Sequence, residues 1–151
     1  MAANTAPIFT DVPVVGTGIW TSSLTANTKS DGAGTIGTDM VKLFTAGTDG
    51  AFINKIRLSP AASTAATATT ATVARFYIST VSTSTTTRTD TLPFAEIALA
   101  AQTADQTTTA ASAFEVPCGF YIPTGTYIHF SMHHAAAANT SWAAIVFGGN
   151  Y

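Results

Sequence analysis

The stretch 41–58, VKLFTAGTDGAFINKIRL, constrains the fold more than any other part of the chain. Apolar runs flank residues 46–50, a segment that contains glycines and one aspartate. Glycine adopts positive φ without a Cβ clash, and aspartate can accept hydrogen bonds from its own turn backbone. The pattern therefore predicts two β-strands joined by a glycine turn, arranged as a hairpin of a β-sandwich.

The second of these strands is predicted to be irregular. Ile53 and Ile56 are an odd number of residues apart, so a regular strand would point them to opposite faces. One extra residue in the strand restores a common face for such a pair. We therefore expect a β-bulge near Asn54 and Lys55, with Lys55 and Arg57 together on the other face.

The rest of the chain also favours strands. Residues 73–80 and 125–134 alternate in polarity, which predicts Phe76 and Phe130 on their core-facing sides. Residues 141–147 are apolar on both faces, so this strand should lie centrally in a sheet or bury its second face in a subunit contact.

About eight strands separated by turn signals are expected. The predicted fold is all-β, a single-domain antiparallel β-sandwich that is jelly-roll-like. This domain should occupy residues 14–151 and follow an extended N-terminal arm at residues 1–13.

Charge and cysteine content exclude several classes of protein. Charged residues make up 9% of the 151 residues, against roughly 25% in an ordinary domain. The net charge of −2 provides no excess of positive charge that would attract nucleic acid or an anionic membrane, so neither is an expected partner. Cys118 is the one cysteine, which fits a protein made in a reducing cytosol. We expect neither a signal peptide nor a membrane helix, because no basic, apolar leader and no long apolar window occur.

Catalysis and metal binding have little support in the sequence. Its histidines are His129, His133 and His134. His129 and His133 would lie about 13 Å apart along a strand, which is too far for one zinc ion with bonds of about 2.1 Å. Solvent or interface histidines are expected, and an intersubunit metal or anion site is the alternative. Cys118 has no charged neighbour that would lower its pKa. We expect no enzymatic activity, no cofactor and no metal.

Several segments resemble small structural proteins of tailed bacteriophages and prophages. They are residues 4–10 (NTAPIFT), 25–35 (TANTKSDGAGT), 44–60 (FTAGTDGAFINKIRLSP), 73–79 (VARFYIS) and 147–151 (FGGNY). The resemblance implies a jelly-roll decoration (cement) protein on the capsid surface of the virion, made in the host cytoplasm. The implied partners are the major capsid protein and further copies of the chain, with a trimer favoured.

Under this hypothesis the protein contacts the capsid through its N-terminal arm, two basic side chains and several ring-bearing side chains. The expected interface residues are Ile8, Phe9, Lys55, Arg57, His133, Trp142 and Tyr151. Lys55 and Arg57 would meet an acidic patch. The alternative function is a receptor- or glycan-binding module of a phage head or tail fibre, in which aromatic residues near loops stack on a sugar. Its candidate aromatic residues are Tyr121, Tyr127 and Trp142.

Overall fold

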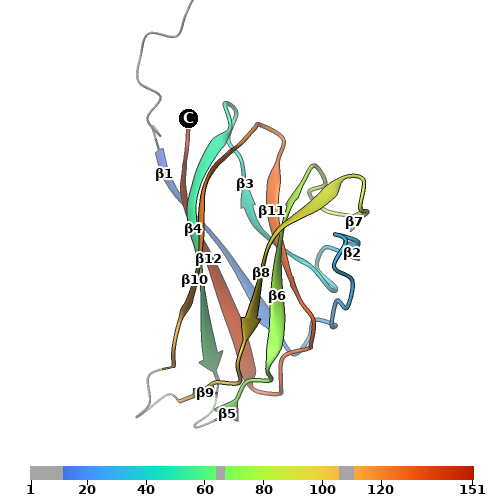
Figure 1. The fold of residues 1–151 in the computed structure, drawn as a ribbon, viewed down its shortest axis with the longest axis vertical. Helices are drawn as coiled ribbons and strands as arrows, with labels where there is room; N and C mark the ends of the chain where they lie inside the picture. The colour runs from blue at the N-terminus through green and yellow to red at the C-terminus, as the bar shows by residue number, and fades with distance from the viewer. Residues whose placement is uncertain (1–11, 64–66, 106–110) are drawn as a thin grey trace, which may run out of the picture.

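The computed structural model describes residues 12–63, 67–105 and 111–151, and these ranges contain strands and no helix (Figure 1). The strands are β1 (Val12–Thr21), β2 (Gly34–Thr35), β3 (Val41–Thr45), β4 (Ala51–Ala62), β5 (Thr67–Ala68), β6 (Thr72–Ser79), β7 (Thr85–Thr86), β8 (Thr91–Leu99), β9 (Thr103–Ala104), β10 (Phe114–Ile122), β11 (Tyr127–Met132) and β12 (Thr140–Asn150). The described ranges therefore offer no helix that could cross a membrane.

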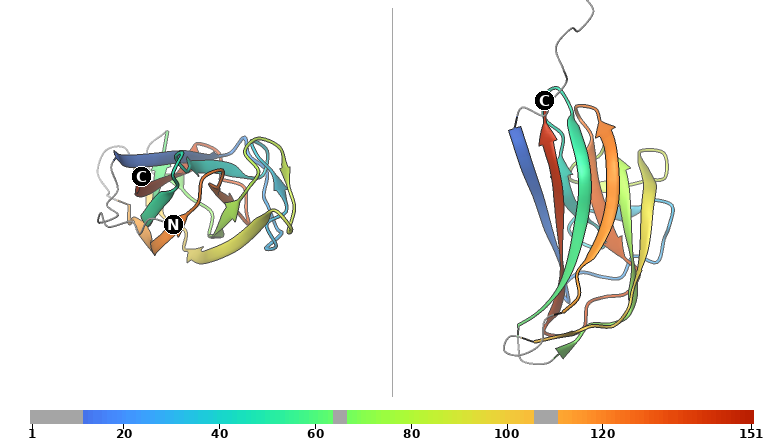
Figure 2. Two further views of the ribbon diagram at one scale, coloured as in Figure 1. Left: turned by 90° about the horizontal axis from the view of Figure 1, so that it is seen from above. Right: turned by 60° about the vertical axis from the view of Figure 1, so that its left-hand side comes forward.

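The long strands form two antiparallel four-stranded sheets. Sheet I has the order β1-β12-β4-β10 and sheet II the order β3-β11-β6-β8 (Figures 1 and 2). Among these long strands the first pairs with the last, the second with the second-last, and so on inward to the adjacent pair β6 and β8. This nested pairing is the topology of a jelly roll, which confirms the predicted fold class.

The core lies between the two sheets. Trp20 and Trp142 enter it from sheet I, while Phe76 and Phe130 enter it from sheet II, and all four are at most 1% exposed. The Phe130 ring stacks on Phe76 with centroids 6.1 Å apart and meets the edge of Trp20 at 5.9 Å. Such aromatic pairs contribute beyond the area they bury. The inward faces predicted for the strands around Phe76 and Phe130 are confirmed.

The glycine turn at residues 46–50 connects the two sheets. β3 belongs to sheet II and β4 to sheet I, so the two predicted strands exist but the predicted hairpin between them is wrong. Gly50 turns the chain with φ of 94°, and a Cβ there would lie 2.7 Å from the carbonyl oxygen of Ile122. The partners of β3 and β4 are distant in sequence, and the local apolar pattern does not identify them.

Other boundaries follow the prediction more closely. β12 lies between β1 and β4, as expected for a strand that is apolar on both faces. β1 begins earlier than predicted, because Val12 and Pro13 of the expected arm pair with Asn150 and Gly149. The rest of that arm, including Ile8 and Phe9, lies outside the described residues.

Candidate functional site

β1 is an open edge of sheet I. It is 10 residues long and pairs on one side only, with β12. It carries no charged residue, and its single proline, Pro13, stands near its start. Val15 and Ile19 project from its outer face and are 58% and 57% exposed. A long, uncharged edge strand with exposed apolar side chains is a template for a strand from another chain.

Each of the other edge strands carries a feature that opposes such pairing. β10 contains Pro117 next to a register shift. β8 contains Pro93 and the acidic Glu96, and β3 is only 5 residues long and contains Lys42. Proline, charge, bulges and short length are the usual protections of a sheet edge. Among the edges of the two sheets, β1 is therefore the one left open.

A groove of about 350 Å³ follows this open side between β1 and β3. Gly16 lets the two strands approach closely, because a Cβ there would lie 2.3 Å from the carbonyl oxygen of Leu43. No ladder joins β1 to β3 within the described part of the chain. Within the described residues, no strand pairs with the side of the β1 backbone that faces away from β12.

A second feature lies on the outer face of sheet I, where β4 is irregular. Phe147 pairs with Lys55 and Gly148 with Ile53, so Asn54 has no partner in β12. The expected bulge near Asn54 and Lys55 is therefore confirmed. Because the extra residue turns both isoleucines toward the core, Ile53 and Ile56 are each 0% exposed. The extra residue, Asn54, is exposed on the surface of the sheet.

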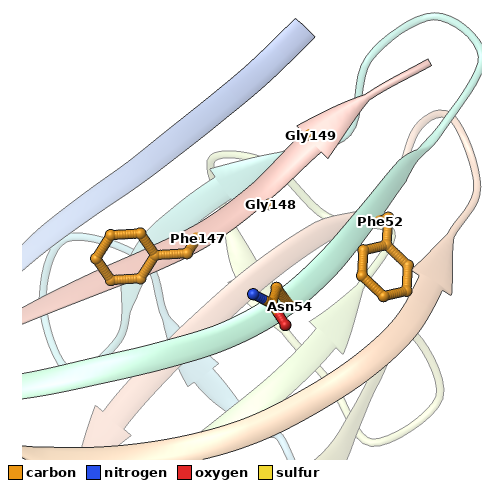
Figure 3. Close-up of a pocket in the computed structure, with 5 residues that line it drawn as sticks. All are labelled: Phe52, Asn54, Phe147, Gly148 and Gly149. Carbon is orange, nitrogen blue, oxygen red and sulfur yellow. The ribbon is translucent and has the colours of Figure 1, made fainter. Parts of the chain in front are cut away.

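The bulge opens a depression of about 370 Å³ between β4 and β12, lined by Phe52, Asn54, Phe147, Gly148 and Gly149 (Figure 3). Figure 3 shows Asn54 between the rings of Phe52 and Phe147. Gly148 must lack a side chain, because a Cβ would lie 2.4 Å from the carbonyl oxygen of Phe52. Within the described residues the Asn54 amide has no hydrogen-bond partner.

Further rings extend this surface toward the edge strand β10. Tyr121 meets Phe52 edge-on with centroids 5.9 Å apart, and Tyr151 stacks on Tyr121 at 5.0 Å. Tyr121 is 54% exposed. Burial, followed by interaction with Tyr121, raises the pKa of Tyr151 to about 12, so this phenol is neutral at physiological pH. Sequence reasoning named Tyr121 and Tyr151 but missed Phe52 and Phe147. The only signal that pointed to this place was the irregular spacing of Ile53 and Ile56.

Lys55 and Arg57 share the outer face of sheet I, as predicted. Lys55 Nζ lies 2.8 Å from Glu115 Oε1 and 5.7 Å from the centroid of the Phe147 ring. The hydrogen bond from Lys55 lowers the pKa of Glu115. Lys55 thus already has a carboxylate partner in its own chain, which leaves Arg57 as the more available cation for an acidic patch.

Trp142 is not on the surface. It is 1% exposed, because the alternation along β12 points it into the core, where its ring meets Phe114 at 5.9 Å. The expectation of an exposed Trp142 for capsid or sugar contact is therefore wrong. Tyr127, the remaining aromatic candidate, is half-buried and lies under Lys42 Nζ at 5.6 Å.

The histidines occupy different environments. His129 is 0% exposed, so the expected solvent or interface position is wrong for it. Its Nε2 lies 2.7 Å from the carbonyl oxygen of Val81, in a loop that covers the outer face of sheet II. His133 is half-buried, with Nδ1 3.4 Å from Nη1 of Arg75, and His134 is exposed. No cluster of metal-binding side chains forms in the described ranges.

The loop between β1 and β2 also covers sheet II. Arg75 is 8% exposed and donates from Nε to Glu96 Oε1 at 2.9 Å and from Nη1 to the carbonyl oxygen of Asn27 at 3.3 Å. These bonds hold the loop against β6. Arg75 points away from the core on β6, and the loop over it explains why it is buried.

No protein-family model matches the chain, and no curated protein matches it. Among solved structures, a chain of the cyanophage Pam1 capsid asymmetric unit is similar over 100% of this chain and 93% of its own length, at 17% identity and a TM-score of 0.44. A chain of the infectious bursal disease virus particle is similar over 98% of this chain and 35% of its own length, at 14% identity and a TM-score of 0.33. A mutant VP2 protein of the same virus is similar over 98% of this chain and 36% of its own length, at 15% identity and a TM-score of 0.32.

Proposed function

We propose that the protein is a structural component of a bacteriophage virion, a decoration (cement) protein that binds the major capsid protein at the capsid surface. The observation that carries this proposal is the open β1 edge of sheet I. A partner strand along β1 would satisfy its free backbone groups and cover Val15 and Ile19, which are more than half exposed. Monomeric proteins protect such an edge, whereas subunits of an assembly use it.

The energetics of such docking are those of strand addition. Each intermolecular backbone hydrogen bond would contribute about 0.5–1.5 kcal/mol net. Covering an apolar side chain such as Val15 or Ile19 adds at most about 1.5–3 kcal/mol, and less here because each is already partly covered. Contacts of this kind across the joints between capsid subunits would raise the barrier to rupture of the shell.

The proposal includes a homotrimer as the oligomeric state and no catalytic role. Cys118 supports the latter point, because burial raises the pKa of its thiol to about 11 and so suppresses the nucleophilic thiolate. Arg57 is the proposed cation for an acidic patch on the capsid protein.

The copy number in purified virions tests the function. Quantitative mass spectrometry should find the protein in numbers comparable with the capsid protein, and a cryo-EM map should place its density on the shell. Absence from virions, or a few copies at a tail or fibre, would contradict the proposal.

The β1 edge itself is tested with purified protein and particles that lack it. Val15→Lys and Ile19→Lys place a charge on the edge strand and should weaken particle binding at least about tenfold, as each removes a buried apolar contact. Leu92→Lys is the matched control, because Leu92 is 61% exposed and lies on β8 of the other sheet. If Val15→Lys and Ile19→Lys bind particles as tightly as Leu92→Lys and the wild type do, β1 is excluded as the docking edge.

A further inference from the structure

We propose that the depression around Asn54 is a binding subsite for a neutral sugar ring. This inference does not depend on the β1 edge. The subsite lies on the outer face of sheet I between β4 and β12, whereas a partner strand would extend the sheet beyond β1. A protein docked along β1 could therefore still present this face to a glycan.

The aromatic walls fit the apolar side of a sugar. A pyranose ring has a face of C–H groups that carry partial positive charge, and the face of an aromatic ring carries negative charge from its quadrupole. Phe52 and Phe147 flank the depression and are half-buried, so each keeps some ring surface exposed. Tyr121 continues the aromatic surface next to Phe52.

The amide of Asn54 fits the polar edge of the same ligand. A carboxamide both donates and accepts hydrogen bonds, as each sugar hydroxyl does. The bulge puts this amide between the two rings, and within the described residues nothing else bonds to it. Apolar walls with a few polar groups that fix orientation are typical of small-ligand sites.

Charge and shape narrow the ligand class. None of the residues that line the depression is charged, and the nearest lysine, Lys55, is bound to Glu115. Lys55 Nζ lies 5.7 Å from the centroid of the Phe147 ring, but its bond to Glu115 makes it a poor partner for a sulfate, sialate or phosphate group. Its volume of about 370 Å³ lies near the lower end of ligand pockets, which run from roughly 300 to 1,000 Å³.

A hydrophobic side chain from a partner protein is a poorer occupant. Such a side chain would press against Phe52 and Phe147 and also remove Asn54 from water without giving it a hydrogen bond. An unsatisfied buried amide opposes binding. A sugar ring meets the rings with its C–H face and the amide with its hydroxyls, so it leaves no group unpaired.

The open shape predicts weak binding by one site, with dissociation constants of about 1–10 mM, which many copies on one particle would convert to avidity. We would titrate the ¹⁵N-labelled full chain with methyl glycosides of glucose, galactose, mannose and N-acetylglucosamine to about 100 mM, a concentration well above such constants. At least one glycoside should shift the amide resonances of residues 52–54 and 147–149 in a saturable way.

Variants test the assignment. Asn54→Asp keeps the shape but removes the amide donor, and Phe52→Leu removes an aromatic wall; each should weaken binding at least about fivefold. Leu92→Ala, on the other sheet, should leave it unchanged. Asn54 is exposed, so its variant should fold even if that of Phe52 does not. No saturable shift with any glycoside, shifts that map elsewhere, or unchanged affinity in Asn54→Asp would overturn the proposal.

Discussion

Acidification is expected to destabilise the protein through His129. Nε2 of this buried ring donates to the carbonyl oxygen of Val81 at 2.7 Å, and Nδ1 is buried without a partner. Protonation would place a charge and an unsatisfied N–H in the protein interior. Lys42 faces the ring from β3, Tyr77 lies opposite it on β6, and Tyr127 stacks on it, so no carboxylate among these neighbours compensates the charge.

The direction of the effect follows from these surroundings. Burial is the main cause that lowers the pKa of His129, Lys42 lowers it further, and the Val81 carbonyl acts the other way. In the unfolded chain the pKa is about 6.5. Above that pH both states are neutral and the full stability is present. As the pH falls below about 6.5, only the unfolded state takes up the proton, and stability is lost until the pH passes the folded pKa.

The size of this change in stability is limited by the uptake of a single proton. A single site of this kind changes the free energy of unfolding by at most about 1.4 kcal/mol for each pH unit. The slope from His129 is expected between about pH 6.5 and 5, and the carboxylates of Asp90 and Glu115, whose pKa values are lowered, titrate at more acidic pH.

Urea unfolding at a series of pH values measures the slope. The control is His129→Gln, whose amide can still donate to Val81 but does not titrate, while His133 and His134 remain in both proteins. The difference in stability between the two proteins should change with pH across this window. Parallel curves would refute the reasoning. So would a histidine NMR titration of the wild type that gives His129 a pKa at or above about 6.5.

Further predictions concern packing and reactivity. Phe130→Ala removes the ring that contacts Trp20 and Phe76 and should lower the free energy of unfolding in urea by about 3–5 kcal/mol; a loss below about 1 kcal/mol would contradict its place in the core. Gly148→Ala puts a Cβ 2.4 Å from the carbonyl oxygen of Phe52 and should cost about 1–3 kcal/mol in the same assay, whereas an unchanged midpoint would show that the bulge yields freely. The thiol of Cys118, with its pKa raised to about 11, should react with iodoacetamide at least about tenfold more slowly than free cysteine near pH 8, and a rate equal to that of free cysteine would contradict its burial.

Local patterns in the sequence predicted what depends on neighbouring residues. The spacing of Ile53 and Ile56 located the bulge in β4, because a strand must point both side chains into one core. The alternation around Phe76 and Phe130 identified their inward faces for the same reason. The apolar stretch before the C-terminal glycines predicted the central position of β12.

Contacts between distant segments decided the rest. The glycine turn at residues 46–50 resembles a hairpin turn locally, yet β3 and β4 find partners in different sheets. His129 and Arg75 occupy polar positions of their strands, and only the loops folded over sheet II bury them.

The amino-acid sequence by itself determined the all-β class, where the eight long strands of the described ranges lie, and that β4 contains an extra residue, whereas the two-residue strands β2, β5, β7 and β9 were not expected. Tertiary structure alone decided that this residue, Asn54, stands between Phe52 and Phe147, and that β1 is left as the open edge. The physical reason is that side-chain periodicity is a property of one strand, whereas an edge and a depression exist only once strands from distant parts of the chain have paired.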